Sequence, residues 1–417
     1  MKIDFIALSV PVFFLLIFVE LIYGYWKKES YYRLNDTLTN LSCGIGQTVL
    51  GLWLKFYFVF LMAYFYKFRF FEIPNTWYYG VLLFVGVDFC YYWFHRLSHE
   101  VNAIWATHVV HHQSEEYNLS VALRQSWFQT LFSSSFYIPL PFLGFHPAMI
   151  ATIIAFNTLY QFWIHTRTIK KMPWIIELIF NTPSHHRVHH GTNPIYIDRN
   201  HAGSLIIWDR IFGTFQKEEE EVVYGITSPL RSWSPIWANA HYWKEIGKLS
   251  LSTKKFSHMV LAFIMPPGWQ PKSMGGRQYA PPVNLEYVKY NPPIAKKVSV
   301  YLLIQYVFIV GVTSYFMFFG KPMMEEGVTQ ATVVRSIYIA IYIILSITSI
   351  GFLLESKRIA IYLEYLRIIV LGCMGLMFLS ESYANYAMLV AGLLSLVSFI
   401  HFTTLVVTKQ TRTQVEA

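Results

Sequence analysis

The stretch HRLSHEVNAIWATHVVHH, residues 95–112, places five histidines directly after a hydrophobic segment. His95 and His99 are four residues apart, so on a helix both imidazoles project from the same face. A second burst, SHHRVHH at residues 184–190, repeats these helical spacings, and His165 stands alone between the two bursts. Nine of the chain's fifteen histidines are therefore predicted to bind metal and to carry catalysis: His95, His99, His108, His111, His112, His165, His186, His189 and His190.

The number of these histidines points to more than one metal ion. A tetrahedral zinc site needs only four ligands, whereas nine imidazoles suit a dinuclear site of an imidazole-preferring metal such as iron. A lone histidine on an apolar face is more often a hydrogen-bonded core residue, and we keep that interpretation for His146, His241, His258 and His401. It fails for the cluster, since each protonation of one imidazole would disfavour the next.

The order of the motifs resembles the fatty acid hydroxylase and sterol desaturase superfamily of membrane di-iron enzymes. The resemblance is closest to the branch that cleaves glyceryl ether lipids, and VDFCYYWFHRLSHE, YNLSVALRQS, NTPSHHRVHHG and LIIWDRIFGTF carry it. It is dense from Val85 to Leu230 and reaches a later stretch, SIGFLLESKR. His201, in RNHAG, stands where that branch is expected to have an aromatic residue, so either a bystander or an added polar group is expected there.

The resemblance implies two iron ions, dioxygen as co-substrate and tetrahydrobiopterin as reductant. Hydroxylation of the ether-linked carbon would give a hemiacetal, which separates into a fatty aldehyde and glycerol. An alternative stays open: a sterol or fatty-acyl hydroxylase or desaturase of the same superfamily, supplied by a cytochrome or ferredoxin donor. A metal sensor or transporter without turnover is disfavoured, because a carrier does not need nine histidines on one side of a membrane.

Other polar residues near the histidines are assigned supporting roles. Asp88, two helical turns before the first histidine, is expected either to accept a hydrogen bond from a ligand imidazole or to bond a neighbouring helix. By the resemblance, Gln161 is a candidate metal ligand on the helical face of the isolated histidine. His185 falls outside the HxxHH spacing and is expected to orient a ligand or head group. Four residues are predicted to contact cofactor or substrate: Glu100, Glu115, Glu116 and Arg124.

The composition indicates a polytopic membrane protein, because hydrophobic residues make up 54% of the chain and charged residues only 14%. The net charge of +9 suits an anionic membrane surface. It does not indicate nucleic-acid binding, since the basic residues form no long run. Cys43, Cys90 and Cys373 show no metal or redox spacing, so disulfides are not expected.

We therefore expect an all-α polytopic membrane protein with roughly nine apolar helices and a cytosolic, histidine-rich di-metal site. Residues 1–76 would be N-terminal transmembrane helices, 77–297 the catalytic region, and 298–417 C-terminal transmembrane helices. The loops on the histidine side are the more basic ones, which places that side in the cytosol. The expected partners are a lipid substrate and the membrane, which would be the endoplasmic reticulum in a eukaryote or the plasma membrane in a bacterium. The nine apolar runs are 3–26, 41–66, 77–94, 126–145, 148–165, 298–319, 333–354, 359–379 and 384–407.

Overall fold

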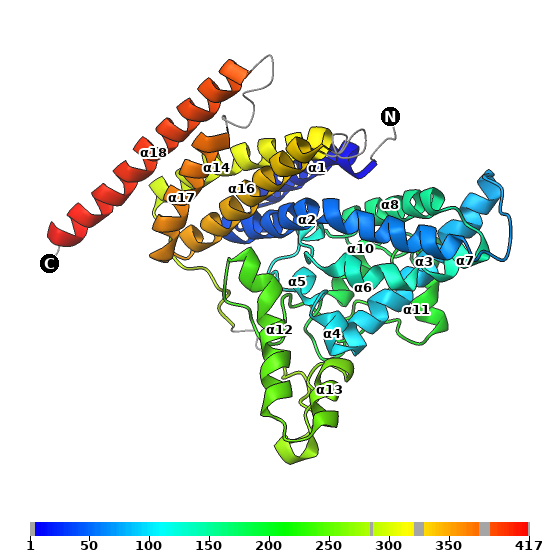
Figure 1. The fold of residues 1–417 in the computed structure, drawn as a ribbon. Coiled ribbons are helices and arrows are strands. Elements are labelled where there is room, and N and C mark those ends of the chain that lie inside the picture. The colour runs from blue at the N-terminus through cyan, green and yellow to red at the C-terminus, as the bar shows by residue number, and fades with distance from the viewer. Residues whose placement is uncertain (1–4, 284–286, 321–328, 375–383, 416–417) are drawn as a thin grey trace. The chain divides into compact units, whose positions relative to one another are not determined.

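The computed structural model describes residues 5–283, 287–320, 329–374 and 384–415. Within these ranges the regular structure is helical, apart from one isolated antiparallel bridge between Gly191 and Tyr224 (Figure 1). The all-α part of the prediction is therefore confirmed. Two compact units are present: Met1–Arg231 with Trp237–Lys289, and Ser232–Ile236 with Tyr290–Ala417. The division at residues 76 and 297 stays a prediction.

The first unit is built on three long helices, α1 (Phe5–Lys27), α2 (Leu34–Tyr66) and α3 (Trp77–Glu100). A core of buried side chains joins α2 and α3 to α8 (Pro147–Trp163), with Met62, Leu83, Val87 and Ile150 fully buried. This packing fixes the course of α3. It therefore also fixes the positions of His95 and His99 in the last turns of that helix.

Shorter elements complete the first unit and surround the histidines. Pro139 opens one of them, α7, and Gly144 ends it with a φ of 111°, a left-handed conformation that favours glycine. The shorter elements are α4 (Asn102–Trp105), α5 (Val109–His112), η1 (Val121–Leu123), α6 (Gln129–Phe136), α7 (Pro139–Leu143), α9 (Trp174–Ile179), α10 (Pro183–His189), α11 (Ile207–Ile211), α12 (Pro235–Ser252), α13 (Phe256–Ile264) and η2 (Lys272–Met274).

The second unit is a bundle of long apolar helices around one buried ion pair. Arg367 donates to Glu364 on the same helix and to Tyr342, and neither charged side chain is more than 1% exposed. Tyr301 also donates to Glu364. These bonds tie three helices of the bundle together. Its elements are α14 (Lys296–Tyr315), the π-helical turn η3 (Phe316–Gly320), α16 (Gln330–Leu354), α17 (Ile359–Met374) and α18 (Ala384–Val415).

Four helices in the described ranges are long and apolar enough to cross a membrane: Phe5–Lys27, Leu34–Tyr66, Lys296–Phe318 and Val333–Leu354. Crossing the hydrocarbon core takes about 20 helical residues. The predicted run 126–145 instead divides into α6 and α7, of eight and five residues, each too short to cross alone. The predicted count of nine is thus not confirmed, and the end of the run 359–379 lies outside the described residues.

The buried pair in the second unit makes a prediction about stability. Glu364→Ala leaves the Arg367 charge without its partner inside the bundle and should cost about 3–5 kcal/mol. The double variant Glu364→Leu with Arg367→Met removes both charges and should recover most of that loss. Thermal unfolding of the detergent-solubilised protein measures both. A single variant as stable as the wild type would contradict the prediction.

Candidate metal centre

The nine predicted histidines come together as two groups. Each residue of a group offers one nitrogen, and those nitrogens all lie within 4.8 Å of one another. No imidazole in either group is more than 6% exposed. The first group is His95, His99, His108, His112 and His189, and the second is His111, His165, His186 and His190.

Both groups draw on the same short helices. His111 and His112 are neighbours on α5 but belong to different groups, and so are His189 and His190 at the end of α10. Adjacent helical residues point about 100° apart, so the two imidazoles of such a pair point to different groups. The two groups are therefore adjacent, as a dinuclear centre requires.

Backbone carbonyls fix the protonation of four of the rings. A carbonyl oxygen only accepts hydrogen bonds, so a ring nitrogen facing it must carry the proton, and the other nitrogen then presents a lone pair. The Nδ1 atoms donate in this way from His95 to His201 O at 2.7 Å, from His189 to Arg199 O at 2.9 Å, from His111 to Arg124 O at 3.0 Å and from His165 to Gln161 O at 2.7 Å.

The resulting lone pairs face one another, which fits a cation at each group. Burial lowers the pKa of His111 to about 4 and that of His165 well below its usual value, so both rings are neutral. Their Nε2 atoms nevertheless lie 3.1 Å apart. Two nitrogens each about 2.1 Å from one ion, at right angles, lie about 3.0 Å apart. In the first group, His95 and His108 show a matching Nε2 separation of 2.9 Å.

The loop that follows the last histidines is held by two buried carboxylates. Asp209 accepts from the backbone N–H groups of His201 at 2.7 Å and Ala202 at 2.8 Å. Asp88 accepts from the backbone of Ser204 at 2.7 Å and also from Leu205, Asn157 and Trp208. Sequence reasoning gave Asp209 no role, although a carboxylate within the apolar WDRIFGTF stretch is itself a signal. These bonds place the carbonyls that orient the rings of the first group.

Asp88 and Gln161 belong to one hydrogen-bond chain rather than to the histidine groups. Gln161 donates its side-chain amide to Asn157 at 2.6 Å, and Asn157 donates to Asp88 at 2.6 Å. Of the two expectations for Asp88, the contact with a neighbouring helix is the one observed. The part of Gln161 that reaches a histidine is its backbone carbonyl, which accepts from His165.

His185 lies outside both groups and caps the helix that carries the last histidines. Its ring nitrogen Nδ1 lies 3.4 Å from the backbone nitrogen of Thr182, completing a capping box at the start of α10. Burial lowers the pKa of His185 to about 4. Its contacts therefore support the position of α10 as a whole.

Arg124 is a buried link between the segment around His108–His112 and α2. It donates to Val110 O at 2.7 Å, to Asn40 at 3.1 Å and to Gln113 at 2.8 Å, and its side chain is 2% exposed. Its own carbonyl accepts from His111. These contacts favour a structural role over the predicted grip on cofactor or substrate.

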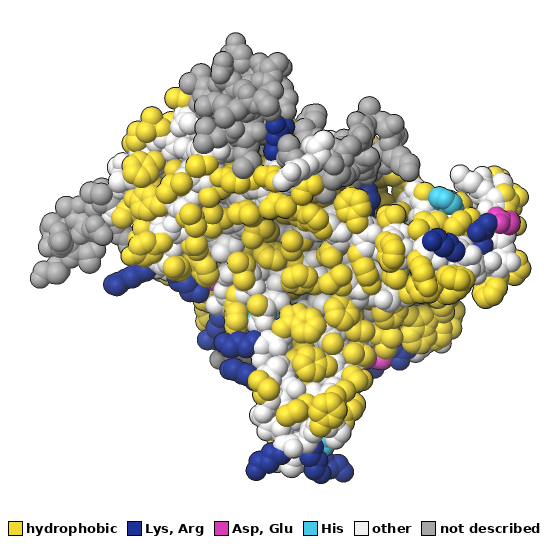
Figure 2. Space-filling view, viewed as in Figure 1, with side chains coloured by type: hydrophobic (Ala, Val, Ile, Leu, Met, Phe, Trp, Pro, Cys, Tyr) yellow, Lys and Arg dark blue, Asp and Glu magenta, His cyan; other side chains and the backbone are white. Residues whose placement is uncertain are grey.

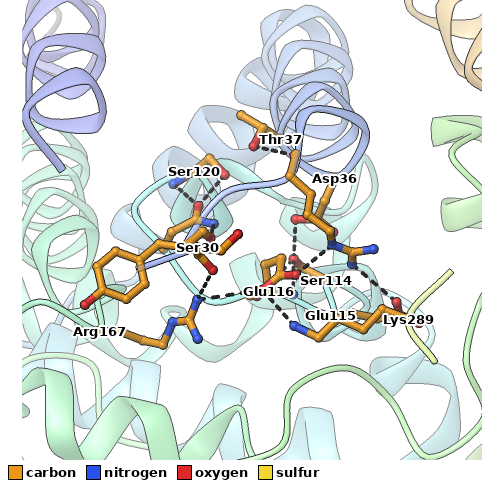
Figure 3. A network of polar contacts seen from close by, with 12 residues as sticks. Ser30, Asp36, Thr37, Ser114, Glu115, Glu116, Ser120, Arg167 and Lys289 are labelled. Carbon is orange, nitrogen blue, oxygen red and sulfur yellow. Dashed lines mark hydrogen bonds and ion pairs between the residues drawn. The ribbon is translucent and has the colours of Figure 1, made fainter. Parts of the chain in front are cut away.

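The predicted glutamates lie in ion pairs. Glu100 pairs with Arg96 at 2.9 Å. Glu116 pairs with Arg33 at 2.6 Å and Lys289 at 2.8 Å, and Glu115 accepts from Tyr287 at 2.7 Å. Figure 3 shows that the contacts of Glu115 and Glu116 gather around the segment that follows His112. These ion pairs, with residues from distant parts of the chain, hold the segment after His112 in place.

His201 lies against the first group without joining it. Its side chain is fully buried, and its ring centroid is 5.1 Å from that of His99. Its backbone carbonyl accepts from His95, and its Nε2 lies 3.1 Å from Asp198 O. The residue is thus an added polar group beside the site.

The two groups make a prediction about metal content. His111→Ala and His165→Ala each remove a nitrogen from the second group and should lower bound metal from close to two ions per chain to one or fewer. His146→Ala is the matched control, because its ring caps α8 and packs against Tyr66, outside both histidine groups. Elemental analysis of purified protein gives the answer. A wild type with a single tightly bound ion would contradict the dinuclear arrangement.

A second prediction concerns Arg124. Arg124→Met leaves buried acceptors unpaired, at a cost of about 1–3 kcal/mol for each, and should lower both thermal stability and metal content. Intact metal together with a weakened apparent affinity for substrate or cofactor would instead restore the role predicted from sequence.

Comparison with known proteins places these residues in a family. Residues 80–214 match the fatty acid hydroxylase family model. Alkylglycerol monooxygenases from Xenopus tropicalis and Homo sapiens are each 39% identical over 87% of this chain, covering 80% and 81% of their own lengths. The Caenorhabditis elegans alkylglycerol monooxygenase is 30% identical over 69% of the chain and 61% of its own length. No solved structure matches. The chain belongs to the alkylglycerol monooxygenase family.

Proposed function

We propose that this protein is a membrane di-iron monooxygenase that cleaves the ether bond of alkylglycerol lipids. The observation that carries the proposal is the pair of buried imidazole groups in a chain 39% identical to alkylglycerol monooxygenases. The reaction inserts one oxygen atom of dioxygen into the C–H bond of the ether-linked carbon. The other oxygen leaves as water, with two electrons from tetrahydrobiopterin, and the hemiacetal separates into fatty aldehyde and glycerol.

Under this proposal each histidine group holds one iron ion. Imidazole is a suitable ligand for iron, and bound iron supplies the activation of dioxygen. Neutral imidazoles add no charge of their own to the site. The five nitrogens of the first group and the four of the second are the proposed ligands.

The protein residues orient the ligand rings and keep water away from the reacting carbon. The carbonyls of Gln161 and Arg124 keep the protons of His165 and His111 on Nδ1, so their Nε2 lone pairs stay available. Asp88 and Asp209 hold in place the loop after α10, whose carbonyls keep the protons of His95 and His189 on Nδ1 in the first group. Because all nine rings are buried, water has little access to the reacting carbon.

The lipid, the reductant and the membrane side are also part of the proposal. Apolar helices α1 and α2 belong to the same unit as the histidines, which supports access of a lipid chain to the site from the membrane. We place the site on the cytosolic side, where a water-soluble tetrahydropterin is available. Glu100, Glu115 and Glu116 are the proposed polar contacts for it.

The test is turnover by membranes that contain the protein. A 1-O-alkylglycerol should yield fatty aldehyde only when dioxygen and tetrahydrobiopterin are both supplied. His111→Ala should lose essentially all activity, and His146→Ala should keep most of it. Hydroxylation of a sterol or fatty acid with a cytochrome donor, and no turnover with the pterin, would overturn the proposal.

A further inference from the structure

The hairpin of α12 and α13 carries an uncovered apolar stripe. Phe256, Val260 and Ile264 are spaced four residues apart on α13, so they share one face, and their exposed fractions are 79%, 41% and 55%. Leu251, near the end of α12, is 81% exposed. A contiguous exposed apolar surface of this kind marks an interaction site.

The same hairpin is strongly basic. Across α12 and α13, residues 235–264, the only acid is Glu245, against four exposed lysines: Lys244, Lys248, Lys254 and Lys255. The segment that follows adds two more exposed cations, Lys272 and Arg277. Figure 2 shows hydrophobic side chains over the surface of this hairpin and lysines and arginines gathered at its tip. Apolar side chains flanked by cations are typical of helices that lie in a membrane interface.

The hairpin is attached firmly to the first unit, next to the metal ligands. Tyr242 donates to the side chain of Asn102 at 2.7 Å, and Asn102 donates to Ala262 O at 2.9 Å. The backbone of Asn102 also donates to Met265 O at 3.0 Å. Asn102 is three residues after His99, so the hairpin and the first histidine group are tied to the same short segment.

The direction of the hairpin fits a membrane surface. Within the first unit, α12 and α13 run crosswise to α1 and α2 (Figure 1). Because α1 and α2 are candidate membrane spans, a helix pair crosswise to them runs parallel to the plane of the bilayer. We propose that the α12–α13 hairpin lies in the interface of the same bilayer, with Phe256 and Leu251 at the acyl boundary and its cations on anionic head groups.

A soluble acidic partner would explain the lysines equally well, but the apolar residues favour lipid. The two most exposed apolar side chains of the hairpin, Leu251 and Phe256, flank Lys254 and Lys255 in the sequence of a chain with candidate membrane spans. Through Asn102, the depth of the hairpin then sets the depth of the first histidine group. This inference goes beyond the proposed function and holds for any lipid substrate.

The experiment measures the depth of the hairpin in the full chain. Cys373 is the exposed cysteine among the three, so Cys373→Ser provides the background for a single label. A fluorophore is attached to Phe256→Cys or, as the matched control on the same hairpin, to Lys244→Cys. Each labelled protein is reconstituted into phosphatidylcholine vesicles with and without phosphatidylserine. Quenching by spin-labelled lipid is compared with quenching by aqueous iodide.

We expect the label at position 256 to be quenched by lipid and shielded from iodide, and the label at position 244 to show the reverse. Lys254→Gln with Lys255→Gln should weaken this insertion in phosphatidylserine vesicles by roughly fivefold per lysine. An unchanged metal content in that double variant shows that its fold is intact. A label at 256 that iodide quenches as strongly as the one at 244, in both vesicle types, would overturn the proposal and leave the surface to a soluble partner.

Discussion

The structure depends on hydrogen bonds from imidazole Nδ1–H groups to backbone carbonyls. Each such bond settles which ring nitrogen carries the proton, and so which one presents a lone pair to the centre. Buried neutral rings then face one another across separations such as the 3.1 Å between His111 and His165. Without a cation, these lone pairs would repel. The arrangement is therefore one that metal binding completes, and metal affinity should contribute directly to the stability of this region.

Most of the surrounding polar network keeps those carbonyls in place. Asp88 and Asp209 bind the backbone of the loop after α10, while Arg124 ties the segment around His108–His112 to α2 through Asn40. Glu116 adds ion pairs from Arg33 and Lys289. Charged groups so deeply buried are costly unless they are paired. They hold two adjacent histidine groups whose geometry would tolerate little error if each is to bind the proposed metal ion.

The sequence by itself determined the class of protein and the members of the site. Apolar composition and helical spacing predicted an all-α membrane chain, and spacings of three and four residues identified eight of the nine histidines that meet in the two groups. The ninth, His165, was predicted from its place between the two bursts and from the family resemblance. Such patterns are local, because residues three or four apart share a helical face whatever the tertiary structure. The count of nine spans went further than local pattern allows. Residues 129–143 form two short helices, the second beginning at Pro139, although the predicted run 126–145 contains no charged residue.

Only the tertiary structure decided how the histidines divide and what supports them. His111 and His112 are adjacent in sequence but serve different groups, a result that depends on where α3, α8 and α10 bring their own histidines. The contacts of Arg124 were also beyond sequence reasoning, because its burial and its hydrogen bonds to Val110, Asn40 and Gln113 depend on how separate segments pack. The carbonyls of Arg199 and His201 gave no signal at all, since every residue has a carbonyl. Their function comes from position alone, and position is a product of packing between distant segments.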